Sequence, residues 1–341
     1  KTDPQAVSEL SADVFIYGAD CACYNRKNIL RQGSIILKKT ISSLLFTIVL
    51  CVSFLSGCIL DELSLNDVSF GDFVSQEPAG TPPREEIVPG AAGELTISFL
   101  DVGQGDSAFV ELPDGKTMLI DAGEAEAGER IVSFIHEKGY RKIDYLIATH
   151  PHADHIGGMK AVVQAFEIGE IYMPKASTNT KTYENLLEAI SEKGLKIKTA
   201  QAGVQICAGV ELLAPAGESY EELNNYSAVL RIVNAEHRFL FMGDAEILSE
   251  DEILEAGYDV RADVVKVGHH GSGTSSGDAF VEATGARYAI ISVGAGNSYN
   301  HPHVFVVEKW QAAGAQIFRT DEQGTITVRS DGTELEVTSE K

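Results

Sequence analysis

Short apolar runs alternate with amphipathic stretches from Leu95 to the end of the chain. A run of about four to eight apolar residues is typical of a buried strand, and apolar positions three or four apart are typical of a helix. The pattern predicts strands at 95–100, 107–112, 117–120, 145–149, 228–233, 238–242, 262–267, 288–293 and 316–318. It predicts helices through 131–135 and over 159–166, 182–193, 245–255, 278–284 and 304–313. Hairpins mixed with strand–helix units indicate an α/β fold with two sheets and helices outside them.

The segment ahead of this domain has the pattern of a targeting sequence. Lys38 and Lys39 precede an apolar run, 41–55, that ends in Leu-Ser-Gly-Cys. This run is shorter than the ~20 residues of a membrane-spanning helix and has the layout of a secretory signal. Its end resembles the cleavage site of prokaryotic lipoproteins, so we expect a signal peptide at 37–57 and a lipid anchor on Cys58. The alternative is an uncleaved anchor helix, and both place the domain outside the cytoplasm, at the membrane.

The remaining N-terminal residues carry no periodic pattern. Residues 1–36 do not start with Met and precede the signal, so we interpret them as a gene-prediction artefact. Residues 58–93 contain several Pro, Gly and acidic residues, which is typical of a flexible tether. The sequence therefore predicts one domain at 94–341.

The composition of the chain excludes some classes of function. The chain has 27 Lys and Arg against 50 Asp and Glu, a formal net charge of −23. Because a phosphate backbone binds clustered cations, this balance argues against broad nucleic-acid binding, although not against a local groove or a phosphate held by metal. The hydrophobic content of 44% excludes a wholly disordered chain.

Three histidines and an aspartate lie within six residues, directly after a buried strand. They are His150, His152, Asp154 and His155 in the segment His-Pro-His-Ala-Asp-His. Imidazole and carboxylate together suit Zn, Mn or Fe, and the mixture does not choose among them. We expect this loop to bind metal, with the first two histidines on one ion and Asp154 and His155 on a second.

This segment resembles the signature of the metallo-β-lactamase fold, a family of mostly dinuclear hydrolases. Three further segments match in the family's order: Ile-Asp-Ala-Gly at 120–123, Gly-Asp at 243–244 and His-His-Gly-Ser at 269–272. The resemblance implies a four-layer αββα sandwich of two mixed sheets. It also implies that Asp121 orients the metal loop, that Asp244 bridges two divalent ions, and that His270 is the last ligand with His269 on the phosphate, although the reverse assignment stays open.

The resemblance extends to the hydrolase domain of the DNA-uptake protein ComEC, over roughly 95–338. It rests on Asp-Val-Gly-Gln-Gly-Asp-Ser at 101–107, Asn-Asn-Tyr-Ser at 224–227, and Asn-Ser-Tyr-Asn-His-Pro at 297–302. The histidine that the wider family places ahead of the bridging aspartate is absent, and the segment containing Asn225 stands there instead. Because an amide is a weaker ligand than imidazole, we expect Asn225 to support a weak first site, which favours Mn²⁺ over Zn²⁺.

These features predict a surface-anchored, metal-dependent phosphodiesterase or nuclease. Lys266, His269 and His301 are expected to surround the phosphate, together with Asp154 as a catalytic carboxylate. The expected partners are a phosphodiester, with DNA as one candidate, and the membrane through Cys58; the sequence identifies no protein partner. Two alternatives remain: a metallohydrolase acting on a cell-wall or small-molecule ester, and a non-catalytic surface binding protein.

Overall fold

A computed structural model describes residues 93–341 of the chain. The predicted artefact, signal peptide, lipid-anchor cysteine and tether lie outside these residues, except for the tether's last position. Among the described residues, every helix is too short or too polar to cross a bilayer.

Eight strands form the first sheet, in the spatial order β15-β14-β1-β2-β3-β4-β5-β6. Antiparallel pairs join β15 to β14, β14 to β1, β1 to β2 and β2 to β3, whereas β3 to β6 run parallel. The strands are β1 (Leu95–Phe99), β2 (Ala108–Glu111), β3 (Thr117–Ile120), β4 (Lys142–Ile147), β5 (Glu167–Met173), β6 (Ile197–Thr199), β14 (Ile326–Ser330) and β15 (Leu335–Ser339).

Seven strands form the second sheet, in the order β13-β12-β11-β10-β9-β8-β7. Here β10 to β13 run parallel and β7 to β10 antiparallel, so this sheet is mixed as well. The strands are β7 (Gln205–Cys207), β8 (Val210–Ala214), β9 (Val229–Asn234), β10 (His237–Phe241), β11 (Val264–Lys266), β12 (Tyr288–Ile291) and β13 (Gln316–Arg319).

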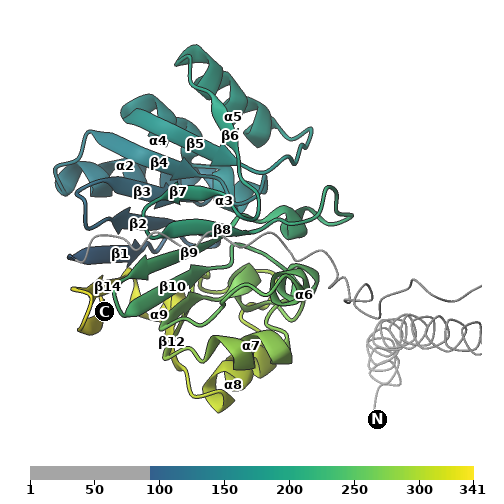
Figure 1. The fold of residues 1–341 in the computed structure, drawn as a ribbon. Coiled ribbons are helices and arrows are strands. Elements are labelled where there is room, and N and C mark those ends of the chain that lie inside the picture. Colours follow the sequence, from purple (N-terminus) through teal and green to yellow (C-terminus); the bar gives the residue numbers. More distant parts are fainter. Residues whose placement is uncertain (1–92) are drawn as a thin grey trace, which may run out of the picture. The chain divides into compact units, whose positions relative to one another are not determined.

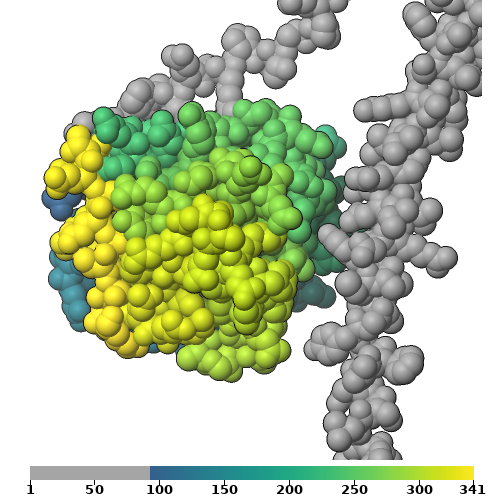
Figure 2. All heavy atoms as spheres, turned by 90° about the horizontal axis from the view of Figure 1, so that it is seen from below, coloured from purple at the N-terminus to yellow at the C-terminus, as the bar shows by residue number. Residues whose placement is uncertain are grey.

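Helices cover the outer face of each sheet (Figure 1). Those beside the first sheet are α2 (Gly128–Glu137), α3 (Ala153–Ile156), α4 (Met159–Ala165) and α5 (Lys181–Glu192), with the 3₁₀ turn η1 (Ala125–Ala127). Those beside the second are α6 (Ile247–Glu255), α7 (Asp278–Thr284), α8 (Val304–Ala312) and α9 (Thr320–Gln323), with turns η2 (Leu223–Tyr226) and η3 (Gly268–Gly271). Figure 2 shows the face formed by the later of these segments, in yellow-green and yellow.

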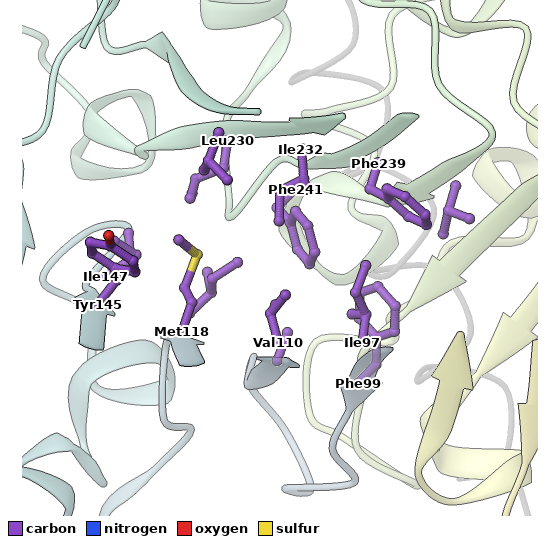
Figure 3. Packing of buried hydrophobic residues seen from close by; sticks show 14 of the residues in the cluster. Ile97, Phe99, Val110, Met118, Tyr145, Ile147, Leu230, Ile232, Phe239 and Phe241 are labelled. Atoms are coloured by element: carbon purple, nitrogen blue, oxygen red, sulfur yellow. The ribbon is translucent and has the colours of Figure 1, made fainter. Parts of the chain in front are cut away.

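Three apolar layers hold the sheets and helices together. The central layer lies between the sheets, where Phe99 and Met118 of the first face Leu230 and Phe241 of the second (Figure 3). A second layer packs α2, α4 and α5 on the first sheet, and a third packs α6, α7 and α8 on the second. Helix, sheet, sheet and helix follow in that order, which confirms the predicted four-layer αββα fold of two mixed sheets.

The predicted strands and helices all have counterparts in the structure, with ends displaced by a few residues. The prediction named no strand at β5, β6, β7, β8, β14 or β15. The two ends of this list show why: β5 begins with alternating exposed positions, and β15 is largely exposed. Strands whose apolar runs are interrupted in this way give little periodic signal.

Candidate metal centre

The predicted site residues converge where strands of both sheets end. Asp121 follows β3, the histidine loop follows β4, Asp244 follows β10, and the histidine pair follows β11. Within each sheet these strands are parallel neighbours, so their carboxyl ends lie on the same edge. In open α/β sheets such edges are the usual place for ligands.

Four side chains form the first cluster: Asp154, His155, Asp244 and His270. His155 Nε2 lies 3.1 Å from Asp244 Oδ1, and His270 Nε2 lies 3.2 Å from Asp154 Oδ2 and 3.5 Å from Asp244 Oδ1. Three of these buried atoms, His155 Nε2, His270 Nε2 and Asp244 Oδ1, have no hydrogen-bond partner within residues 93–341. Buried polar atoms are nearly always paired. Three unpaired atoms that point at one another are therefore suited to bind a cation together, and the mixture of nitrogen and oxygen ligands suits a transition metal.

The second cluster is His150, His152 and Asp244. His150 Nε2 lies 2.8 Å from His152 Nδ1 and 3.8 Å from Asp244 Oδ2. His269 Nε2 lies 3.8 Å from the same carboxylate oxygen. The two oxygens of Asp244 therefore face different sets of imidazoles, as a carboxylate shared by two ions would.

Asp121 fixes the metal loop from behind. The residue is fully buried, and its Oδ2 accepts hydrogen bonds from Thr149 Oγ1 at 2.6 Å and from His155 Nδ1 at 2.7 Å. Its Oδ1 accepts the Thr149 backbone N–H at 2.8 Å. By binding His155 Nδ1, the carboxylate leaves Nε2 directed at Asp244, which is the usual role of a residue behind a metal ligand.

A backbone carbonyl and Asp106 together lie behind the other histidine. His270 Nδ1 lies 3.2 Å from Asp106 Oδ1 and 2.9 Å from the Ser292 carbonyl. The sequence did not distinguish a supporting role for Asp106 from a turn role. It lies far along the chain from the histidine pair, and only the fold brings the two together.

Lys266 lies beneath the site rather than in its opening. Its ammonium is 2.6 Å from Asp106 Oδ2 and donates to the Val267 carbonyl at 2.7 Å, and the residue is only 3% exposed. This position differs from the expected phosphate contact. The physical reason is Asp106, since a buried carboxylate needs a cation close to it.

The Asn-Asn-Tyr-Ser segment supports the site, but its amides are not among the ligand atoms of the two clusters. The Asn225 amide donates to Glu246 Oε2 at 3.1 Å and accepts from Ser249 Oγ at 3.0 Å. Its influence on the site of His150 and His152 would therefore pass through Glu246, which lies 3.9 Å from His269 Nδ1. Ser227, which the prediction did not single out, contacts the site directly. Its Oγ accepts the Asp244 backbone N–H at 3.0 Å and lies 3.4 Å from His150 Nδ1.

Carboxylates and imidazoles of the clusters shift one another's pKa values. Burial opposes charge on His155 and His270, yet Asp244 and the neighbouring carboxylates raise the pKa of His155 well above its usual range and that of His270 to about 10. Against its burial, the same histidines hold the pKa of Asp244 well below its usual range. Without a metal, protons on imidazole thus balance the carboxylates. A divalent cation would replace those protons, which is how metal binding couples to pH.

The histidine pair has an unusual backbone. His269 and His270 have φ values of 50° and 52°, in the left-handed region that side chains other than glycine seldom adopt. Because of this conformation, the two adjacent side chains point to different clusters. His270 is buried in the first cluster, and His269 faces the second with part of its ring exposed. Such strain is typical of functional sites.

The site opens on one side. Asp154 and His269 are partly exposed, and the His301 ring lies 5.5 Å from that of His269. Burial and the neighbouring histidines lower the pKa of His301 to about 4, so the ring is neutral at pH 7. A cavity of about 400 Å³ lies beyond β5 and β6, lined by Lys175, Gln201 and Tyr226 among others. None of the clustered carboxylates and histidines lines this cavity.

Comparison with known proteins agrees with this geometry. The family model described as the Metallo-beta-lactamase superfamily matches residues 100–295. ComE operon protein 3 of Bacillus subtilis (strain 168) is 32% identical over 263 residues, which are 71% of this chain and 34% of that protein. Competence protein ComA of Neisseria gonorrhoeae is 31% identical over 245 residues, 71% of this chain and 33% of that protein. The chain thus spans about a third of the length of these relatives.

Among solved structures, the chain is similar to CmlA, a diiron beta-hydroxylase from Streptomyces venezuelae. It is 18% identical, with a TM-score of 0.47, over 70% of this chain and 54% of that one.

Proposed function

The chain belongs to the metallo-beta-lactamase superfamily of metal-dependent hydrolases, and on that premise we propose that its site hydrolyses phosphodiesters. The observation that carries the proposal is the position of Asp244 between two sets of donors. Its Oδ1 faces His155 and His270, and its Oδ2 faces His150 and His269. Paired metal sites of this kind suit phosphate esters, because two cations can neutralise both the attacking and the leaving oxygen.

Each ion would have its own set of ligands, with Asp244 shared between the two. Asp154, His155, Asp244 and His270 would hold one, and His150, His152, Asp244 and His269 the other; both sets mix imidazole and carboxylate, which suits Mn²⁺ or Zn²⁺. The second assignment gives His269 the place of the histidine absent from the Asn-Asn-Tyr-Ser segment. When bound, divalent ions supply Lewis acidity and lower the pKa of water toward neutrality.

The chain's own groups would prepare the reaction. Asp121 and Asp106 hold the rings of His155 and His270 in place, and Lys266 compensates the charge of Asp106. Against its burial, His155 and His270 keep the pKa of Asp154 low. Its carboxylate is therefore ionised at neutral pH and able to bind a cation. His301 lies on the open side as a neutral hydrogen-bonding group for a phosphoryl oxygen.

Hydrolysis by the full chain tests the reaction class. The assay supplies Mn²⁺ or Zn²⁺ and compares a chromogenic phosphodiester with a phosphomonoester, a carboxyl ester, a lactam and linear DNA. We expect the diester to be cleaved fastest, and chelation to abolish cleavage. Cleavage of the ester or lactam alone would replace the proposal with another hydrolase. Bound metal without any cleavage would favour a binding protein.

We also propose that the enzyme acts at the cell surface, as part of DNA uptake. The support is the predicted lipoprotein signal with Cys58 and the similarity to two competence proteins. Labelling of cells with a fatty-acid analogue is expected to mark the wild type and leave Cys58→Ser unmarked. Label on both proteins, or on neither, would remove the anchor from the proposal.

A further inference from the structure

Four aromatic rings lie in a row beside the metal centre. Tyr299, His301, His303 and Phe305, here called the aromatic rim, occupy alternate positions between β12 and the first turn of α8. Ring centroids are 5.7 Å apart from Tyr299 to His301, 5.1 Å from His301 to His303, and 5.5 Å from His303 to Phe305. The His301 ring is also 6.5 Å from that of His270, so the rim reaches the first cluster through His301.

The rim exposes large apolar side chains, whereas most such side chains of the described domain are buried. Tyr299 is 61% exposed, Phe305 54% and the adjacent Val304 72%, and in residues 93–341 only Ile197 and Leu248 are comparable large apolar side chains, at 42% each. Clustered apolar exposure beside a catalytic centre indicates a binding surface.

The surroundings hold the rim in place although it is exposed. The Asn297 side chain donates to the His301 carbonyl at 2.6 Å and accepts its N–H at 3.0 Å. The Gly273 N–H donates to His303 Nδ1 at 2.8 Å, and a Cβ on Gly273 would lie 2.5 Å from Phe305 Cζ. Rings fixed before binding lose little entropy when a ligand stacks on them.

Charge narrows the choice of ligand. A chain with a formal net charge of −23 gains no general attraction for a polyanion. Stacking on an aromatic ring does not depend on charge, and every nucleobase has a face that can stack. His301 Nδ1 is buried without a hydrogen-bond partner in the described domain, which leaves it free to bind a polar ligand atom.

We propose that the aromatic rim binds the nucleobase next to the scissile phosphodiester, so that the substrate is a nucleotide rather than a cell-wall or lipid ester. Tyr299 and Phe305 provide the stacking faces, and His301 links them to the metal centre. This inference rests on the proposed phosphodiesterase activity and names its substrate class.

Two diesters with the same leaving group test the inference on the full chain with Mn²⁺. Thymidine p-nitrophenyl phosphate carries a nucleobase, and methyl p-nitrophenyl phosphate does not. We expect the wild type to have a KM about tenfold lower for the thymidine diester, in line with the strength of a single stacked base. The double variant Tyr299→Ala/Phe305→Ala is expected to lose that preference in KM.

Matched variants separate stacking from other effects. Tyr299→Phe keeps the ring and should keep the preference, and Ile197→Ala removes an exposed apolar side chain on a different strand and should change nothing. Equal KM values for both diesters in the wild type would overturn the inference while leaving the phosphodiesterase intact. The same holds if the double variant abolishes self-association measured by light scattering without altering the KM ratio, because the rim would then be an interface between copies.

A binding measurement covers the case in which neither diester is hydrolysed. Calorimetric titration of the full chain with thymidine monophosphate and with methyl phosphate needs no turnover. Tighter binding of the nucleotide, lost in the double variant, would support the rim even if the proposed reaction fails. Equal binding of both ligands to the wild type would refute it.

Discussion

At the scale of single residues, Asp244 differs from every other carboxylate in the described domain because each of its oxygens faces its own set of imidazoles. Asp154 belongs to the first cluster alone, and His152 to the second alone. These memberships make the two clusters separable by mutation. A hydrolase that used only one cation would not need such an arrangement.

Metal content is therefore expected to change in steps. The wild type should bind two divalent ions per chain, Asp154→Ala and His152→Ala one each, and Asp244→Ala fewer than one. Each variant should lose at least ~100-fold in kcat/KM, since removal of residues behind metal ligands alone costs 10–100-fold. Elemental analysis after dialysis measures the ions, and Asp278→Ala, at a side chain 90% exposed, is the control. An equal loss of ions in Asp154→Ala and Asp244→Ala would contradict a shared carboxylate.

At the scale of elements, the loop after β1 positions Asp154. Gly105 has φ +126°, and a Cβ there would lie 2.2 Å from the Asp154 carbonyl oxygen. The neighbouring Asp106 N–H donates to that same oxygen at 3.1 Å. The loop therefore lies directly against the metal loop, and only glycine allows this approach.

Gly105→Ala and Gly103→Ala form a matched pair. Gly103 also has a positive φ, +80°, but a Cβ there would meet nothing within 4 Å. Both variants should lose about 1 kcal/mol in the free energy of unfolding, from the backbone conformation alone. Gly105→Ala should in addition displace Asp154 and lose one metal ion and most of its activity. Equal activity of the two variants would show that the loop does not position Asp154.

A buried carboxylate fixes the loop that follows the histidine pair. Glu250 of α6 accepts the backbone N–H groups of Ser276 and Gly277, each at 2.7 Å. Burial raises the pKa of Glu250 from 4.5 to about 7. Because the folded state then holds its proton more tightly than the unfolded state, this group stabilises the fold fully below pH 4.5. That contribution is lost as pH rises through about 7.

Denaturant titrations of wild type and Glu250→Gln between about pH 4.5 and 8 measure this loss. The free energy of unfolding of the wild type, relative to the variant, should fall by roughly 3 kcal/mol over that window, from 1.36 kcal/mol per pKa unit. The comparison cancels other groups that titrate in both proteins. A difference between the two proteins that stays constant with pH would show that Glu250 titrates in the ordinary range.

The elements were more predictable than the contacts of the site. Apolar periodicity placed β3, β4, β10 and β11, and the compact spacing of the histidine loop identified a metal site, because both signals are local in sequence. Asp106 and Ser227 gave no such signal. Their contacts with His270 and Asp244 arise from the meeting of two sheets, and a sequence pattern carries no information about that distance.

At the scale of the whole molecule, the first sheet supplies the histidine loop, and the second supplies Asp244 and the histidine pair. The central apolar layer between the sheets brings the two contributions into register (Figure 3). Positive charge at the site would come from metal, while the chain as a whole carries −23. The metal site would therefore attract the phosphate of a short substrate, whereas the negative charge of the whole chain repels the many phosphates of a long one.

Salt should reveal this opposition. A protein that binds DNA through a basic groove loses affinity steeply as salt rises, because counterions are released. Here the long-range field repels a long single strand, and raising NaCl from about 20 to 200 mM shortens the Debye length to below ~10 Å. The KM for a long oligonucleotide should then fall severalfold, while that for a mononucleotide diester changes little, as steady-state assays with both substrates would measure. A KM for the long strand that rises with salt would instead place a basic groove on this acidic chain and make stacking on the aromatic rim secondary.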